Sequence, residues 1–219
     1  MDNAAKLEID VSAFNEEATL EELRKEIRMT GFTDGRARIT FSDESPSEIW
    51  SERGEKRTRL SIITAPRREL PTEISITVSP HRINTTSPLV GIKSCNYLEH
   101  LMAYQEAKGR AFDEAIRVNE RGEVASACMA NIFWRKGEKL YTPSLETGCL
   151  SGTTREFVLE NLDCEEIEAP IGEMENANAI FLTSAGIGIV DVSGFEGTPK
   201  GVTEHPILDL FPKTAEPPA

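Results

Sequence analysis

The sequence lacks the features that mark exported, membrane or metal-binding proteins. Its longest apolar runs, such as the one at 177–192, fall short of the ~20 residues that a spanning helix needs, and the first ten residues lack the basic and then apolar order of a signal peptide. Its four cysteines form no C-x-x-C pair, and together with three histidines they match no zinc spacing. We therefore predict a cytoplasmic protein with reduced, mostly buried cysteines, no metal site and no membrane partner.

Basic residues are also scarce. The 219 residues include 24 Lys and Arg against 37 Asp and Glu, which gives a formal net charge of −13 and a pI of about 4.8. Such a chain repels phosphate backbones unless a local basic patch overrides the net charge, so we expect no nucleic-acid partner. With 39% hydrophobic and 28% charged residues, the composition is typical of a soluble globular protein.

The first part of the chain predicts one helix and three strands. Asn15 is positioned to cap a helix over 16–30, in which Leu20, Leu23 and Ile27 recur at helical spacing and which ends at Gly31. Extended segments with partial period-two alternation follow at 37–42, 59–65 and 73–79. The polar stretch 43–57 is either a mobile loop or the long tip of a hairpin.

The second part begins near Pro88 and alternates strand and helix patterns. It contains a helix after Lys93, strands at 114–118, 123–143, 164–170, 179–185 and 187–192, and helices near 152–162 and 205–211. We predict an α/β (α+β) protein of two domains, with a small N-terminal domain at 1–87, a C-terminal domain at 88–212 and a disordered tail at 213–219.

Lys93 is the first candidate for chemistry. It lies just before the predicted helix, directly after the apolar sequence Leu-Val-Gly-Ile. Two interpretations are open: an ordinary surface lysine at the end of a loop, or an amine removed from bulk water for covalent catalysis.

Two short segments suggest anion binding. Gly152, Thr153 and Thr154 place a glycine and two hydroxyl groups at the opening of a helix, which suits a phosphate, although a plain helix cap has the same pattern. Thr183 and Ser184 end a predicted strand and precede small residues, where α/β folds often bind ligands. A lysine and two phosphate-type loops together suit a phosphorylated aldehyde held as a Schiff base.

These motifs also carry a family resemblance. The sequences GIKSCNYLEHLMAYQEAKGRAFDEAI and ACMANIFWRKGEKLYTPSLETGCLSGTTRE make the chain from about Leu89 to Val192 resemble the class IV, fold-type IV aminotransferases. The resemblance is greatest to the aminodeoxychorismate lyase branch. It implies a D-amino-acid aminotransferase-like fold with a small N-terminal domain, pyridoxal 5'-phosphate as cofactor and a homodimer. It also implies a small-molecule amine substrate, either an amino acid or an aminodeoxychorismate-like compound.

The resemblance assigns roles to individual residues. Lys93 matches the Schiff-base lysine, which also acts as general base in transamination or elimination of pyruvate. The cofactor phosphate is expected at Gly152, Thr153 and Thr154 and at the loop of Thr183, Ser184 and Ala185, with Ala185 facing the substrate. Asn131 matches an asparagine that has either a structural role or a ligand contact. The sequence alone, apart from the resemblance, predicts that Arg155 reaches an anion or pairs with Glu156 or Glu160, and that His100 serves packing more than catalysis.

Three departures from the family pattern qualify these roles. Ser126 stands where the family has a glutamate that keeps the pyridine nitrogen protonated, and a neutral hydroxyl stabilises a substrate carbanion less. Asp43 stands where many relatives carry an arginine that grips a substrate carboxylate. The start of the chain resembles the end of the first helix of the family, so that either Met1 is an internal methionine or the N-terminal domain is naturally truncated. We expect the edge of such a shortened sheet to be covered by a partner chain.

Two functional hypotheses therefore remain. The first is a pyridoxal-phosphate enzyme that forms a Schiff base at Lys93. The alternative is a degenerate or incomplete family member without turnover, which serves as a binding or structural protein.

Overall fold

The computed structural model describes residues 2–32, 34–45, 57–66, 73–201 and 205–210. The chain divides into two compact units, Met1–Glu69 and Leu70–Ala219. The predicted tail at 213–219 and most of the polar stretch 43–57 lie outside the described residues.

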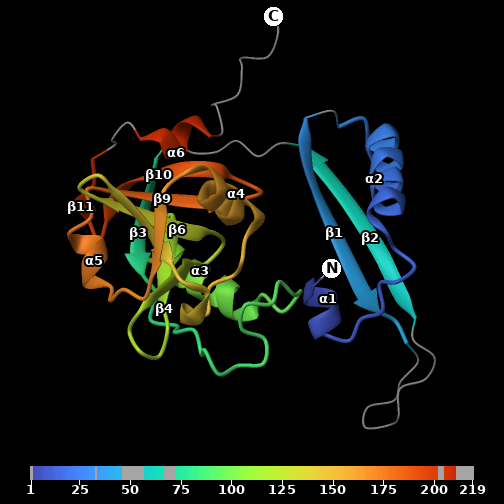
Figure 1. Ribbon diagram of the computed structural model, residues 1–219, viewed down its shortest axis with the longest axis horizontal. Coiled ribbons are helices and arrows are strands. Elements are labelled where there is room, and N and C mark those ends of the chain that lie inside the picture. Colours follow the sequence, from blue (N-terminus) through green and yellow to red (C-terminus); the bar gives the residue numbers. More distant parts are fainter. Residues whose placement is uncertain (1, 33, 46–56, 67–72, 202–204, 211–219) are drawn as a thin grey trace, which may run out of the picture. The chain divides into compact units, whose positions relative to one another are not determined.

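The smaller unit consists of two helices and a hairpin (Figure 1). The elements are α1 (Asp2–Lys6), α2 (Glu16–Thr30), β1 (Gly35–Asp43) and β2 (Thr58–Pro66). Asn15 caps α2 as predicted, since its side chain accepts a hydrogen bond from the Ala18 N–H at 2.8 Å. Gly31 ends α2 with a φ of 75°, a conformation that glycine adopts without strain. Strands β1 and β2 pair antiparallel and form the two arms of a hairpin, and most of the stretch that connects them lies outside the described residues.

The larger unit alternates strands with short helices (Figure 1). Its strands are β3 (Ile74–Val78), β4 (Glu114–Val118), β5 (Val124–Ala127), β6 (Asn131–Lys136), β7 (Lys139–Pro143), β8 (Cys164–Ile167), β9 (Ala179–Ser184), β10 (Gly188–Phe195) and β11 (Thr198–Pro199). Its helices are α3 (Leu98–Gly109), the 3-10 helix η1 (Leu145–Thr147), α4 (Thr153–Asn161), α5 (Gly172–Glu175) and α6 (Pro206–Asp209). The predicted strands and helices are confirmed, whereas α5, η1 and β11 were not predicted because they are too short to show a periodic pattern.

A mixed sheet organises these elements. The strand order is β5-β4-β3-β10-β9-β6-β7-β8, and β11 pairs with β10. Strand β3 runs parallel to both β4 and β10, and β7 runs parallel to β8, whereas the other pairs are antiparallel. The division between the units precedes the predicted boundary at residue 87, because β3 is hydrogen-bonded into the larger sheet and does not pair with the hairpin of the smaller unit.

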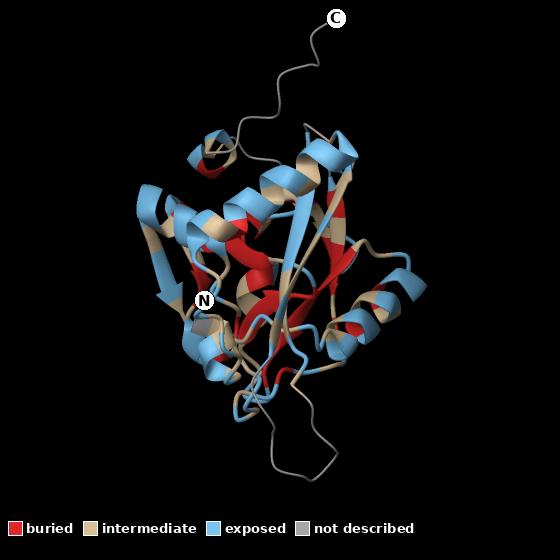
Figure 2. Cartoon of the chain, turned by 90° about the vertical axis from the view of Figure 1, so that its right-hand side faces the viewer, coloured by how far each residue is buried: buried red, intermediate tan, exposed pale blue. Residues whose placement is uncertain are grey.

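Buried side chains concentrate on the strands of the larger unit (Figure 2). The main core includes Ile76, Ile116, Trp134 and Leu182, and a second cluster forms around Phe133 and Phe181. These apolar residues come from strands that are distant in sequence, so burying them holds the sheet together. Within the described ranges, no helix combines the length and the apolar character that crossing a membrane requires.

Candidate cofactor site

The helix α4 begins next to the first residue of β6. Gly152 caps α4, and Thr154 in the first turn is buried. A Cβ atom added to Gly152 would lie 2.2 Å from the Asn131 side-chain oxygen, so only glycine fits this approach. The Asn131 amide in turn donates a hydrogen bond to the Leu150 carbonyl at 2.7 Å. Asn131 therefore has the structural role of holding the loop that leads into α4.

Strand β9 brings the second predicted loop to the same place. Thr183 is the register partner of Asn131 across the β6–β9 pair, and its side chain is fully buried. Its hydroxyl has no hydrogen-bond partner among the described residues. Ser184 ends the strand, and Ala185 is exposed in the turn that follows. The two loops, which are about 30 residues apart in sequence, thus meet through Asn131, where an unsatisfied buried hydroxyl favours binding of a polar group.

Lys93 lies in the loop before α3, and its side chain is exposed. Its amine donates a hydrogen bond to the Tyr97 hydroxyl and lies 5.1 Å from the centroid of the Tyr97 ring. The loop packs on the segment before α4, because a Cβ atom at Gly91 would lie 3.8 Å from the Cys149 carbonyl oxygen. The interpretation of Lys93 as an amine removed from solvent does not hold for this chain by itself. Lys93 is an exposed lysine with one hydroxyl partner.

Ser126 faces a buried cation. It is the register partner of Arg117 across β4 and β5, and residues in direct register place their side chains on the same face of a sheet. Both residues are buried. The neutral residue Ser126 is therefore paired across the strands with an arginine.

A tight turn connects β5, which contains Ser126, to β6, which begins with Asn131. The buried carboxylate of Glu114 accepts hydrogen bonds from the Cys128 and Met129 backbone N–H groups at 3.1 and 3.2 Å. Burial raises the pKa of Glu114. His100 reaches the other side of the turn, since its Nδ1 atom lies 2.9 Å from the Cys128 carbonyl oxygen. Burial and, after it, the positive charge of Arg117 lower the pKa of His100. His100 thus packs between the turn and Lys93, whose charge also lowers its pKa.

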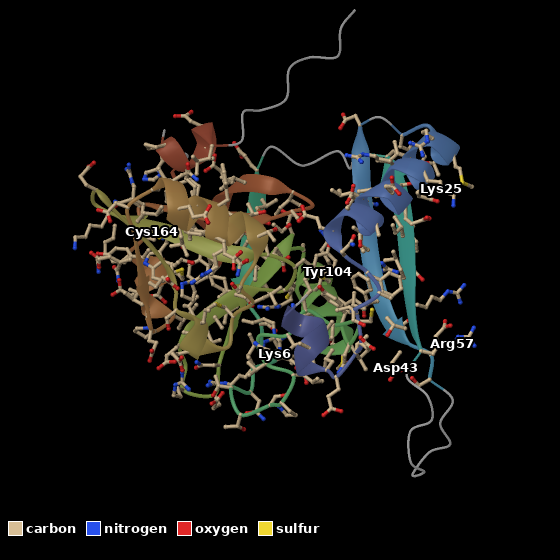
Figure 3. The ribbon with its side chains drawn as sticks, turned by 45° about the vertical axis from the view of Figure 1, so that its right-hand side comes forward. Lys6, Lys25, Asp43, Arg57, Tyr104 and Cys164 are labelled. Atoms are coloured by element: carbon tan, nitrogen blue, oxygen red, sulfur yellow. The ribbon has the colours of Figure 1, made fainter. Side chains whose placement is uncertain are left out.

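Two expectations about charged residues have different outcomes. Arg155 does not pair with Glu156 or Glu160, because its side chain is buried, donates to the Pro143 carbonyl at 2.9 Å and pairs with Glu166 on β8. It joins α4 to the sheet edge and is not a surface residue. For Asp43 the structure gives only its position. It is the last residue of β1, and Figure 3 places it at the same end of the hairpin as Arg57.

The close packing at Gly152 makes a testable prediction. Replacing Gly152 with alanine forces the Asn131 side chain to move, and overpacking of this kind typically costs about 1–3 kcal/mol. We expect the free energy of unfolding, measured by urea denaturation, to fall by that amount. Gly109, which ends α3, is a matched control because an added Cβ atom would meet nothing within 4 Å. Equal stability of the two variants would contradict the packing of α4 on Asn131.

The sheet order, the α4 terminus and the lysine loop define an α/β protein of the fold-type IV class. A putative 4-amino-4-deoxychorismate lyase from Legionella pneumophila superposes with a TM-score of 0.88 and 27% identity, covering 95% of this chain and 78% of that one. A branched-chain aminotransferase from Thermoproteus uzoniensis superposes with a TM-score of 0.87 and 25% identity, covering 95% and 73%. The predicted fold class is thereby confirmed.

The chain belongs to the Amino-transferase class IV family, whose sequence profile matches residues 1–195. The aminodeoxychorismate lyase of Bacillus subtilis is 31% identical over 186 residues, which are 81% of this chain and 64% of that relative. The chain thus spans less than two thirds of the length of this relative.

Three residues of the site were missed in the sequence. Tyr97, Glu114 and Arg117 each contact a residue of the site or of the turn that joins its halves. Tyr97 lies four residues after Lys93 in the loop before α3, and its place next to the lysine in the sequence is a signal that could have identified it. No local pattern marks Glu114 or Arg117, because their contacts depend on strand pairing.

Proposed function

We propose that this chain binds pyridoxal 5'-phosphate through Lys93 and acts on a small amine, either an amino acid or an aminodeoxychorismate-like compound. The reaction would be transamination or elimination of pyruvate. The observation that carries the proposal is the meeting of the α4 N-terminus with the buried, unpartnered hydroxyl of Thr183. A helix N-terminus and an available hydroxyl fit a phosphate group, and the Lys93 amine fits an aldehyde.

Relatives with this fold support the choice of cofactor. An aminotransferase from Brucella abortus with a TM-score of 0.79 is described as bound to pyridoxal phosphate. When bound, this cofactor supplies an aldehyde for amines and a ring that withdraws electrons from the substrate α-carbon.

Each residue of the site would have a defined task. The backbone N–H groups and hydroxyls of Gly152, Thr153 and Thr154 would hold the phosphate, together with the hydroxyls of Thr183 and Ser184. Ala185, which is exposed in the turn after β9, would leave room for the substrate. Lys93 would exchange a proton with the substrate α-carbon. Its hydrogen bond to Tyr97 gives the amine an acceptor that orients it and a hydroxyl with which to share a proton.

Ser126 would face the ring nitrogen. Because its cross-strand neighbour is Arg117, the site offers no negative charge there to stabilise a protonated ring. This observation also favours the second hypothesis, a degenerate or incomplete family member without turnover that forms no stable Schiff base.

Covalent trapping separates the two hypotheses. The purified full chain would be mixed with pyridoxal 5'-phosphate, its absorbance recorded, and the mixture reduced with borohydride before peptide mass mapping. We expect a long-wavelength band and a single label on Lys93. Labelling spread over several surface lysines, or none at all, would overturn the proposal and support the non-enzymatic alternative.

We also propose that the protein is a homodimer. Helix α3 leaves Leu98 and Leu101 exposed close to the lysine loop, and a second copy would remove this apolar surface from water. Light scattering that returns the mass of the single 24.2 kDa chain at high concentration would contradict it. The cytoplasmic location and the lack of a nucleic-acid partner stay predictions from the sequence.

A further inference from the structure

A cavity lies beside the first turns of α3 in the larger unit. Its volume is about 460 Å³, and it is lined by Pro80, His81, Arg82, Glu99, Met102 and Arg117. We propose that this cavity binds the carboxylate of a small organic acid and that the guanidinium of Arg117 holds it.

Arg117 is fixed in the cavity wall by backbone groups. The residue is 1% exposed. Its Nε atom donates to the His81 carbonyl at 3.2 Å, and its Nη2 atom donates to the Arg82 carbonyl at 3.0 Å. The two carbonyl acceptors are neutral. They therefore orient the planar guanidinium group without cancelling its positive charge. A buried, oriented cation is a preorganised receptor for an anion.

One nitrogen of the guanidinium has no acceptor. The Arg117 Nη1 atom lies 3.4 Å from His100 Nδ1, but that nitrogen lies only 2.9 Å from the Cys128 carbonyl oxygen. A carbonyl can only accept, so Nδ1 must carry the hydrogen and cannot accept one from Arg117. Among the described residues no other acceptor for Nη1 is present, and a buried donor without an acceptor favours binding of one.

The anion now paired with Arg117 is weakly held. Glu99 approaches the Nη2 atom at 3.4 Å, and its side chain is 78% exposed at the rim of the cavity. The pair is weak because its distance is long and water competes for the exposed Glu99 carboxylate. A ligand carboxylate that enters the cavity can displace Glu99 and take its place at the Nη2 atom. The side chain of Met102 offers apolar contact to the remainder of a small acid.

The cavity is connected to Lys93 by direct contacts. Lys93 binds the Tyr97 hydroxyl, the Tyr97 ring lies 5.5 Å from the His100 ring, and His100 lies against Arg117. An acid held by Arg117 is thus separated from the amine by two aromatic side chains. In the framework of the proposed function, on which this assignment rests, Arg117 holds a carboxylate that is remote from the reacting carbon of the substrate, because the Tyr97 and His100 side chains separate the cavity from the Lys93 amine.

The test uses the full chain without cofactor, labelled with ¹³C at the methionine methyl groups. Propionate is added as the probe, and propionamide, which has the same shape without the charge, is the comparison ligand. We expect propionate, but not propionamide, to shift the Met102 methyl signal, which is assigned with Met102→Leu. Propionate should also raise the pKa of His100, because a bound anion offsets the positive charge of Arg117.

Two matched variants make the test specific. Glu99→Gln removes the competing carboxylate and should tighten propionate binding by about fivefold, a modest gain typical of an exposed ion pair. Glu106→Gln removes the same charge from α3 but affects the pair with Arg110, away from the cavity, and should leave binding unchanged. Arg117→Met should abolish binding.

The proposal fails if propionamide binds as well as propionate, or if the two glutamate variants behave alike. Because the Glu99 side chain is exposed, this variant gives an answer even if Arg117→Met does not fold. Borohydride labelling of Lys93 is independent of propionate, so a failure of cofactor binding and a failure of carboxylate binding give different results.

Discussion

Replacing Lys93 with alanine is expected to abolish covalent attachment of pyridoxal 5'-phosphate. The side-chain amine is the only atom of Lys93 that can react with an aldehyde, and its hydrogen bond to Tyr97 is lost with it. If the chain turns over a substrate, the loss of the proton-transfer group alone is expected to cost about 10²–10⁴-fold in kcat. The measurements are the long-wavelength absorbance band, borohydride labelling and, once a substrate is found, kcat.

A second lysine provides the control. Lys108 lies on α3 and pairs with Asp113 at 3.2 Å, so Lys108→Ala removes an amine of the same helix region without affecting the lysine loop. The band should persist in Lys108→Ala and be absent in Lys93→Ala. A band of equal strength in both variants would show that another amine reacts, and the assignment of Lys93 would be wrong.

The second large effect concerns stability. Trp134→Ala is expected to lower the free energy of unfolding by about 3–5 kcal/mol, which is typical of truncating a buried aromatic side chain. Trp134 on β6 is fully buried in the main core and stacks on Tyr141 with ring centroids 5.9 Å apart. Domains are usually stable by only about 5–15 kcal/mol, so this loss threatens the fold that positions Asn131 at the start of the same strand.

Urea denaturation followed by far-UV circular dichroism measures this loss. Phe157→Ala on α4 is the control, because Phe157 is 39% exposed and leaves a smaller cavity. Its cost should be well below that of Trp134→Ala. Similar losses in the two variants would mean that Trp134 is not the main support of the sheet centre.

Much of the fold was predictable because its signals are local. Asn15 and Gly31 marked the ends of α2 within a few residues, since capping depends on backbone groups in the adjacent turn. Period-two alternation located β1 and β2 for the same reason. The predicted boundary at residue 87 differs from the division between the compact units at residues 69 and 70, because β3 has the pattern of a strand but nothing in its sequence says which sheet it joins.

The sequence by itself determined the composition class, the elements and the motif residues Lys93, Gly152, Thr154 and Thr183, because each of these depends on neighbours along the chain. Only the tertiary structure decided which of them meet. The β6–β9 register brings Thr183 to Asn131, and the β4–β5 register places Arg117 beside Ser126. Register is set by pairing and burial across the whole sheet, so no short stretch of sequence contains it. For the same reason the environment of His100 and the cavity beside Arg117 emerged only from the packed chain.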